Sequence, residues 1–311
     1  MVPDPLITLI IVAGNFRDRV QRSLRSVLSQ DIADRIAIIV YDRADEPRRD
    51  ISELNNPNVI YEVVANNTTL GQLAKRGLLA ATTDIVAFVD EHVALPAGWA
   101  RESLRLHDQG YAGVCGFFVS GNPQHRCARL ALAVTKGDYI LSKQVGETTA
   151  MPGDNSSFVR SKILDGTEDV EPLLGSDPLL IRHLVAAGEK CYRADLALKH
   201  WNENRWRDAW AAFRFWTQTY ICNQSAIEKW SPTRRLFRLL SIPLVPIVRT
   251  YKNYKLARVN SMDMKQFFVD LPALLFLHSA TAAGMAAGLL FGLRGSDVRF
   301  ADCEINATRP D

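Results

Sequence analysis

Several common functional motifs are missing from this sequence of 311 residues. Its five cysteines show neither CxxC nor zinc-ligand spacing, so we expect reduced, mostly buried thiols in a cytosolic setting. Neither GxGxxG nor GxxxxGK followed by Ser or Thr occurs, which leaves a dinucleotide-binding fold or a phosphate loop of that type without support. The N-terminus has no basic stretch before its first apolar run, and a secretory signal is not expected.

Positive charge is unevenly placed along the chain. Hydrophobic residues make up 47% and charged residues 23% of the chain, which excludes a disordered or polytopic membrane protein. The net charge is +3, yet segment 229–258 holds eight Lys or Arg and no Asp or Glu, so the rest of the chain carries −5. Because this basic segment adjoins the most apolar part of the chain, we expect anionic membrane lipids as its partner and no nucleic acid.

The first 120 residues alternate strand-like apolar runs with segments of helical periodicity. This alternation predicts βαβ units and an α/β fold with a mostly parallel central sheet flanked by helices. Strands are expected at 6–12, 36–40, 59–64, 85–89 and 113–121. Helices are expected at 17–29, 70–81, 128–141, before Gly188, and over 201–227.

Segment 267–293 contains Asp270 and His278 as its only ionisable residues. About 20 apolar residues suffice to cross a bilayer core, so membrane association is expected, with a buried core helix as the alternative. Glycines recur at every fourth position from 284 to 292, a spacing that lets helices pack closely, including helices of two copies of the chain. The chain thus divides into a domain over 1–228 and a helical, membrane-associated region over 229–311.

Three ionisable residues, Asp90, Glu91 and His92, follow the strand expected at 85–89. Ligands of parallel α/β sheets bind beyond the carboxyl ends of the strands. A carboxylate and an imidazole placed there could hold a divalent cation that bridges two phosphates, and the imidazole favours Mn²⁺ over Mg²⁺. An ordinary charged loop is the alternative. Glu91, which alternates to the other face, is expected to matter least.

Seven segments in order resemble glycosyltransferase family 2, with the GT-A nucleotide-sugar-binding fold, across residues 6–215. They resemble the opening strand with its SVLxQ helix, the second strand, the helix before the metal motif, the Pro-Gly-Trp turn, the acceptor-side segment, the loop with the catalytic base, and the following His with its helix. In this chain they read LITLIIVAGNFRDRVQRSLRSVLSQ, IAIIVYD, LGQLAKRGLLAATTDIVAFVDEH, VALPAGWA, MPGDNSSFVRSKIL, LLGSDPLLIRHLVAAG and ALKHWNENRWRDAWAAFRFW. The metal motif ends in His, as in a bacterial membrane-associated subgroup.

The resemblance implies an inverting transfer of a sugar from a nucleotide-diphosphate donor to a lipid-linked or polysaccharide acceptor, at the cytoplasmic face of the inner membrane. Asp177 is then the expected base for the acceptor hydroxyl, with Asp154 and Glu171 as alternatives. The expected ligands of Mn²⁺ or Mg²⁺ are Asp90, His92 and His200. The residues expected to contact or orient the donor are Asp42 at the nucleotide base, Lys75, Asp90 and Asn155.

Three segments depart from the family pattern. Val12-Ala13-Gly14-Asn15 stands for Pro-Thr-Tyr-Asn, Tyr41-Asp42-Arg43-Ala44 for Asp-Asp-Gly-Ser, and Gly175-Ser176-Asp177 for Gly-Glu-Asp. These departures leave the donor base open and keep one alternative, a non-catalytic GT-A-fold scaffold or partner subunit. A processive polysaccharide synthase is a further alternative, disfavoured because NENRW at 202–206 stands in for QxxRW and at most one span is present.

Overall fold

The computed structural model describes residues 4–43, 50–140, 144–259 and 263–309. The chain forms two compact units. The first comprises residues 1–119 and 144–200, and the second comprises residues 120–143 and 201–311. The second unit therefore contains residues on both sides of position 228, and the functional division at 228 stays a prediction.

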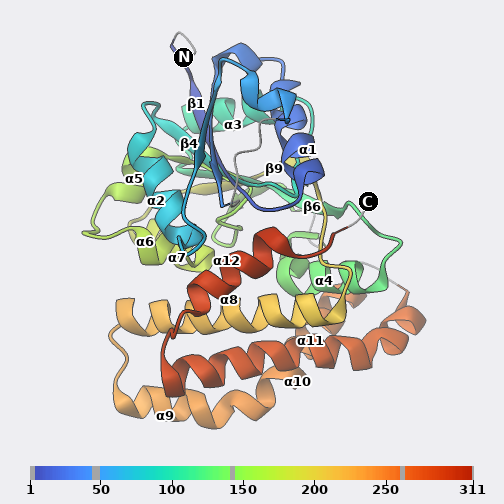
Figure 1. Cartoon of the computed structure of the whole chain (residues 1–311). Coiled ribbons are helices and arrows are strands. Elements are labelled where there is room, and N and C mark those ends of the chain that lie inside the picture. The colour runs from blue at the N-terminus through green and yellow to red at the C-terminus, as the bar shows by residue number, and fades with distance from the viewer. Residues whose placement is uncertain (1–3, 44–49, 141–143, 260–262, 310–311) are drawn as a thin grey trace. The chain divides into compact units, whose positions relative to one another are not determined.

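The first unit is built on a mixed sheet, whose described strands follow the order β3-β2-β1-β4-β8-β6-β9-β5, with β7 paired to β9 (Figure 1). Four neighbouring strands are parallel: β1 (Ile7–Ala13), β2 (Ile36–Asp42), β3 (Val59–Val63) and β4 (Ile85–Asp90). β8 runs antiparallel to β4 and β6, and β5 and β7 run antiparallel to β9. The bounds of these strands are β5 (Val93–Ala94), β6 (Gly113–Ser120), β7 (Gly146–Thr148), β8 (Ser156–Val159) and β9 (Cys191–His200).

Helices cover both faces of the parallel strands, which explains why β1, β2 and β4 read as continuous apolar runs (Figure 1). Helix α2 begins with a capping box, in which the Thr69 hydroxyl accepts from the Gln72 N–H and the Gln72 side chain accepts from the Thr69 N–H. Leu73 of α2 packs with Ile10 and Ile39. The helices of this unit are α1 (Arg17–Leu28), η1 (Ala33–Arg35), η2 (Ser52–Asn55), α2 (Leu70–Ala80), α3 (Trp99–Asp108), α5 (Arg160–Leu164), α6 (Glu171–Leu174) and α7 (Asp177–Ala186).

The predicted α/β fold, with a central sheet flanked by helices and further helices toward the C-terminus, is confirmed. The sheet is mixed, and its four parallel strands form the half that ends at β3. The strand β9 was not predicted, because charged residues interrupt its apolar pattern at Arg193 and Asp195. Its last three residues do alternate, with Leu198 and His200 buried and Lys199 exposed between them.

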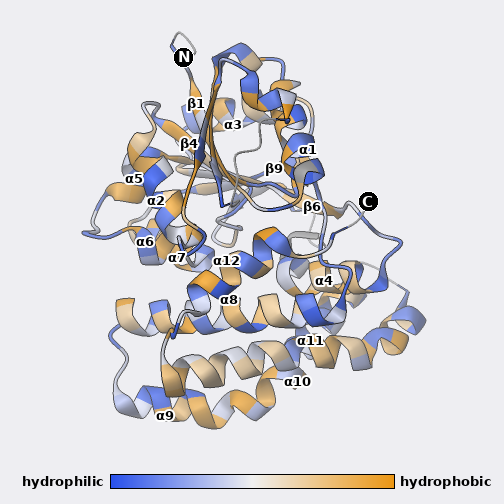
Figure 2. Ribbon diagram, viewed as in Figure 1, coloured by the Kyte–Doolittle hydropathy of each residue, from blue (hydrophilic) through white to orange (hydrophobic). Residues whose placement is uncertain are grey.

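The second unit is helical. It contains α4 (Arg126–Ile140), α8 (Trp206–Ile227), α9 (Pro232–Ser241), η3 (Ile242–Leu244), α10 (Val245–Val259), α11 (Met264–Phe291) and α12 (Ser296–Asn306). Hydrophobic residues run along α11, whereas α9 and α10 mix hydrophobic with hydrophilic residues (Figure 2). Among the described residues, α11 is the helix long and apolar enough to cross a membrane, by length and composition alone, and 44% of its apolar window is buried in the protein.

The glycine spacing of α11 serves packing within the same unit. A Cβ atom at Gly284 would lie 2.3 Å from the carbonyl oxygen of Arg214, and one at Gly288 would lie 2.1 Å from the Ile221 side chain. Both neighbours belong to α8, so these glycines let α11 approach the α8 backbone. Assembly of two copies through these helices stays a prediction.

Candidate active site

The site begins where two strands end. Asp90 is the last residue of β4, His92 lies two residues further, and His200 is the last residue of β9. The antiparallel pairing of β5 with β9 sets Val93 opposite His200, and therefore brings His200 beside His92. Residues 108 positions apart in sequence thus meet at one edge of the sheet.

The three side chains are close enough to share one cation. One possible ligand atom from each of Asp90, His92 and His200 can be chosen so that all three lie within 4.8 Å of one another. His92 Nε2 lies 3.9 Å from Asp90 Oδ2, and the two imidazole rings meet edge to face with centroids 4.7 Å apart. Metal–ligand bonds of about 2.1 Å place two ligands of one ion roughly 3 to 4.2 Å apart, so the cluster needs only a small contraction.

The donor set also fits a divalent cation in its chemistry. Two imidazoles and one carboxylate suit Mn²⁺ or Zn²⁺ better than an all-oxygen set would. The side chain of Asp90 is 24% exposed, whereas His92 and His200 are buried, so the cluster is reached from the Asp90 side. The structure therefore brings together the three residues predicted to bind metal.

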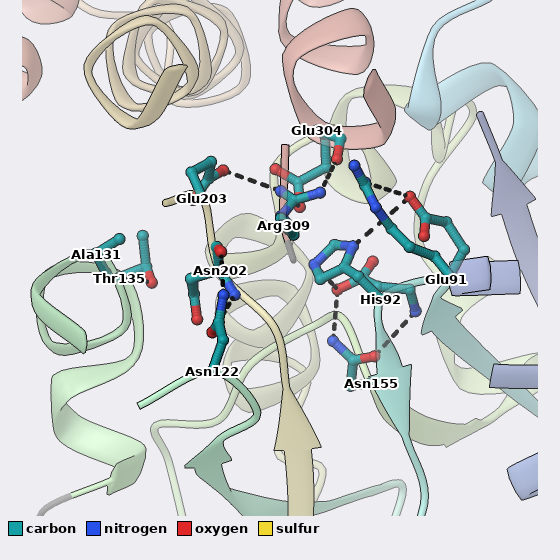
Figure 3. Close-up of polar contacts among 12 residues, drawn as sticks. Glu91, His92, Asn122, Ala131, Thr135, Asn155, Asn202, Glu203, Glu304 and Arg309 are labelled. Carbon is teal, nitrogen blue, oxygen red and sulfur yellow. Dashed lines mark hydrogen bonds and ion pairs between the residues drawn. The ribbon is translucent and has the colours of Figure 1, made fainter. Parts of the chain in front are cut away.

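Asn155 holds the carboxylate of this cluster in place. Its Oδ1 accepts from the Asp90 N–H at 2.9 Å, and its Nδ2 donates to Asp90 Oδ2 at 2.6 Å (Figure 3). Asn155 is fully buried and has a φ of 54°, a left-handed conformation that asparagine tolerates better than most residues. The sequence predicted that Asn155 orients the donor or acceptor, and the structure shows it orienting a candidate metal ligand.

Glu91 points to a different partner. Its Oε1 lies 3.0 Å from Nη1 of Arg19 on α1, and both side chains are almost completely buried. The His92 Nδ1 atom is 3.9 Å from the same carboxylate oxygen, too far for a hydrogen bond (Figure 3). Glu91 thus ties α1 to the end of β4, and its minor part in the chemistry stays a prediction.

Asp177, the predicted base, is the first residue of α7 and is partly exposed. Its Oδ2 accepts a long, 3.4 Å hydrogen bond from the Gly153 N–H. A Cβ atom at Gly153 would lie 2.5 Å from the Asp177 Cβ, so only glycine permits this approach. The alternatives Asp154 and Glu171 are also partly exposed, and Gly71 of α2 packs against the backbone oxygen of Glu171.

Asp42 and Lys75, the other predicted donor contacts, each form a polar contact with another residue of the protein. Asp42 ends β2, is fully buried, and accepts a 2.7 Å hydrogen bond from the Tyr61 hydroxyl. Lys75 of α2 forms a 2.7 Å ion pair with Asp169 at the surface. That pair raises the pKa of Lys75 and lowers the pKa of Asp169. Their contacts to a nucleotide stay predictions, and residues 44–49 after β2 lie outside the described residues.

Sequence reasoning left one supporting residue without a role, Gln30 of the SVLSQ segment. Its Nε2 donates to the Pro96 carbonyl at 3.0 Å, and its Oε1 accepts from the Ala100 N–H in the first turn of α3. The turn after the candidate metal cluster is therefore anchored to the end of α1. The SVLxQ pattern that the chain shares with the family was the signal in the sequence.

A family model described as glycosyl transferase family 2 matches residues 8–164, half of the chain. No curated protein matches the chain by sequence. A fragment of S. aureus TarS in complex with UDP has a TM-score of 0.50 and 11% identity, covering 89% of this chain and 90% of that one. A longer S. aureus TarS structure has a TM-score of 0.48 and 13% identity, covering 89% of this chain, which spans only 55% of its length. At 11% identity, the likeness to the TarS fragment shows the fold alone. By its family match, with the GT-A type of fold, this chain belongs to glycosyl transferase family 2.

Proposed function

We propose that this chain transfers one sugar, with inversion, from a nucleotide-diphosphate donor to a lipid-linked or polysaccharide acceptor. The observation that carries the proposal is the turn at 152–155. Gly153 of this turn contacts the candidate base Asp177, and Asn155 of the same turn fixes the candidate metal ligand Asp90. A displacement at a sugar carbon requires a base for the acceptor and compensation of charge on the leaving diphosphate, and the turn connects the two groups suited to these tasks.

The residues divide these tasks as follows. Asp177 accepts the proton of the attacking hydroxyl, since it is partly exposed at the start of α7. Asp90, His92 and His200 would hold Mn²⁺, or Mg²⁺, and Asn155 hydrogen-bonds the Asp90 carboxylate. A cation bound there would neutralise charge on the leaving diphosphate. Asp42 and Lys75 would contact the nucleotide.

The proposed place of action is the cytoplasmic face of the inner membrane. Segment 229–258 carries eight positive charges without an acidic residue, and anionic lipids attract such segments by about 1 kcal/mol per Lys or Arg. Nucleotide sugars are made in the cytosol, so the chain would meet both its donor and the anionic lipids on that side of the membrane.

The direct test is a donor screen with full-length protein, Mn²⁺ and a membrane lipid extract, following release of nucleoside diphosphate. UDP-sugars come first, because the TarS fragment was solved with UDP. We expect release from one donor that depends on both the extract and the cation. No release from any nucleotide sugar would favour the non-catalytic scaffold.

Substitution of Asp177, compared with substitution of Asp154, tests which carboxylate is the base. Asp177→Asn should lower the transfer rate by at least about 10²-fold, the usual scale for loss of a general base, and should leave donor affinity nearly unchanged. The matched control is Asp154→Asn, which alters a partly exposed carboxylate in the adjacent turn. Near-normal transfer by Asp177→Asn with a large loss in Asp154→Asn would reassign the base.

A further inference from the structure

The apolar side of α9 faces away from the other helices of the second unit. Leu236, Phe237 and Leu240 are 56%, 72% and 71% exposed. At 100° per residue they share one side of the helix, while Arg234, Arg235 and Arg238 occupy the other. Arg234 forms an ion pair with Glu228, and Arg235 donates to the Ser225 hydroxyl, so the arginine side is the one turned toward the protein.

The exposed apolar surface continues into η3 and the start of α10. Leu244, Ile247 and Val248 are each about three-fifths exposed. Further along the same exposed side of α10 follow Tyr251 and three cations, Lys252, Lys255 and Arg258. Contiguous large apolar side chains are rare on the surface of a soluble monomer. Their position beside these three cations is complementary to one occupant, a bilayer with anionic headgroups.

Helix α11 is long enough to cross a bilayer, but its polar side chains are committed to the protein. Asp270 pairs with Arg126 of α4 at 2.7 Å, and His278 Nε2 lies 2.7 Å from Asn253 Oδ1 of α10. Asp270 and His278 are both at most 5% exposed. A crossing would strip α8 and α10 from this helix, or would carry their polar residues into the hydrocarbon region.

The segments on either side of α9–α11 are also joined. Arg309, after α12, forms a buried 2.9 Å ion pair with Glu203, before α8 (Figure 3). The Ser296 hydroxyl of α12 lies 3.0 Å from the Thr219 hydroxyl of α8. A single crossing by α11 would place these partners on opposite sides of the membrane. If α9–α10 and α11 crossed the membrane as the two arms of a helical hairpin, α8 and α12 would stay on the same side. The first arm would then carry the cations of α9 and α10 through the bilayer.

We propose that α9, η3 and α10 lie in the plane of an anionic membrane surface and insert their apolar side chains, while α11 stays within the protein and does not cross. This inference rests on the proposed action at a membrane. The proposed contact with the membrane is therefore interfacial. The residues that insert are Leu236, Phe237, Leu240, Leu244, Ile247 and Val248.

Vesicle flotation of the full-length protein tests the surface. The protein should float with vesicles of phosphatidylcholine and phosphatidylglycerol, and much less with phosphatidylcholine alone or at high salt. The double variant Phe237→Glu/Leu240→Glu should lose at least about 10-fold in partitioning. The matched control Ile60→Glu/Leu79→Glu alters two apolar residues that are 52% and 55% exposed on the first unit, and should float like the unaltered protein. Equal losses in both variants, or no flotation of the unaltered protein, would overturn the proposal.

Protease protection tests the absence of a crossing. An epitope tag is added after residue 311, and the protein is assayed in sealed inverted membrane vesicles. Added protease should remove the tag as fast as it degrades the first unit, because both would lie on the outer side of these vesicles. A protected tag would show that α11 crosses and would overturn the proposal. Neither assay uses a nucleotide sugar, so an inactive protein that floats would refute only the proposed function. An active transferase that ignores vesicles would refute only this inference.

Discussion

At the scale of single residues, the candidate metal cluster consists of two buried histidines and one carboxylate that is partly exposed. We expect Asp90→Ala, His92→Ala and His200→Ala each to weaken Mn²⁺ binding by at least about 10-fold, because each removes one protein ligand. Isothermal titration of the metal alone measures this without any substrate. The matched control is His183→Ala, a partly exposed histidine of α7 that bonds the Asp165 carbonyl. Unchanged Mn²⁺ affinity in all three variants would make this cluster an ordinary polar edge of the sheet.

Asn155 is a positioning residue, and its backbone allows a sharp test. Because its φ is 54°, glycine fits the same conformation, and Asn155→Gly removes the amide without straining the chain. Loss of a group that orients a metal ligand typically costs 10- to 100-fold in affinity, and we expect a loss of about that size for Mn²⁺. Thermal unfolding monitored in parallel separates this effect from instability. A variant that binds Mn²⁺ normally would show that Asp90 needs no such support.

At the scale of elements, the helix pair α10–α11 contains a buried histidine with a consequence for stability. Burial, assisted by the positive charge of Arg249, lowers the pKa of His278 to about 3. In the unfolded chain a histidine titrates near about 6.5, so between these values the unfolded state binds the extra proton. Stability is therefore full above about pH 6.5 and decreases as the pH falls below it, by up to about 1.4 kcal/mol per pH unit.

Replacing this histidine should flatten the acid limb of the stability profile. We expect His278→Gln to lose about 2 kcal/mol less than the unaltered protein between pH 7.5 and pH 5, as measured by urea unfolding. The glutamine amide can still donate to Asn253 Oδ1, the partner of His278 Nε2. Parallel profiles for the two proteins would mean that His278 does not govern acid unfolding.

Sequence periodicity was sufficient for the parallel strands, because a strand buried on both faces is a continuous apolar run between turn residues. It was insufficient for β9, where Arg193 and Asp195 interrupt the pattern. His200 was therefore predicted as a ligand from the family resemblance, without the strand that positions it. The Arg19–Glu91 pair joins residues 72 positions apart and has no local signal. Such contacts follow from tertiary packing, which periodicity does not encode.

At the scale of the whole molecule, the apolar C-terminal region belongs to the fold rather than trailing from it. Helix α8, assigned by sequence to the catalytic domain, shares a unit with α11 and α12. Gln218 of α8 donates to the carbonyls of Gly292 and Leu293, just after α11. A boundary placed where the composition changes therefore falls between helices that pack together in one unit.

Truncation after residue 228 tests whether residues 1–228 fold alone. The truncated chain would lose α11, against which Ala209, Ala212 and Phe213 of α8 are buried, and would leave Glu203 without Arg309. Exposing an apolar helix face and a buried carboxylate together is costly, so we expect the truncated protein to aggregate or to bind a hydrophobic dye strongly. The full-length Phe237→Glu/Leu240→Glu variant is the matched control, since it alters only exposed side chains and should stay folded and soluble. A soluble, monomeric chain of residues 1–228 that unfolds cooperatively and releases nucleoside diphosphate would instead establish the boundary at 228 and reduce the C-terminal helices to a dispensable membrane anchor.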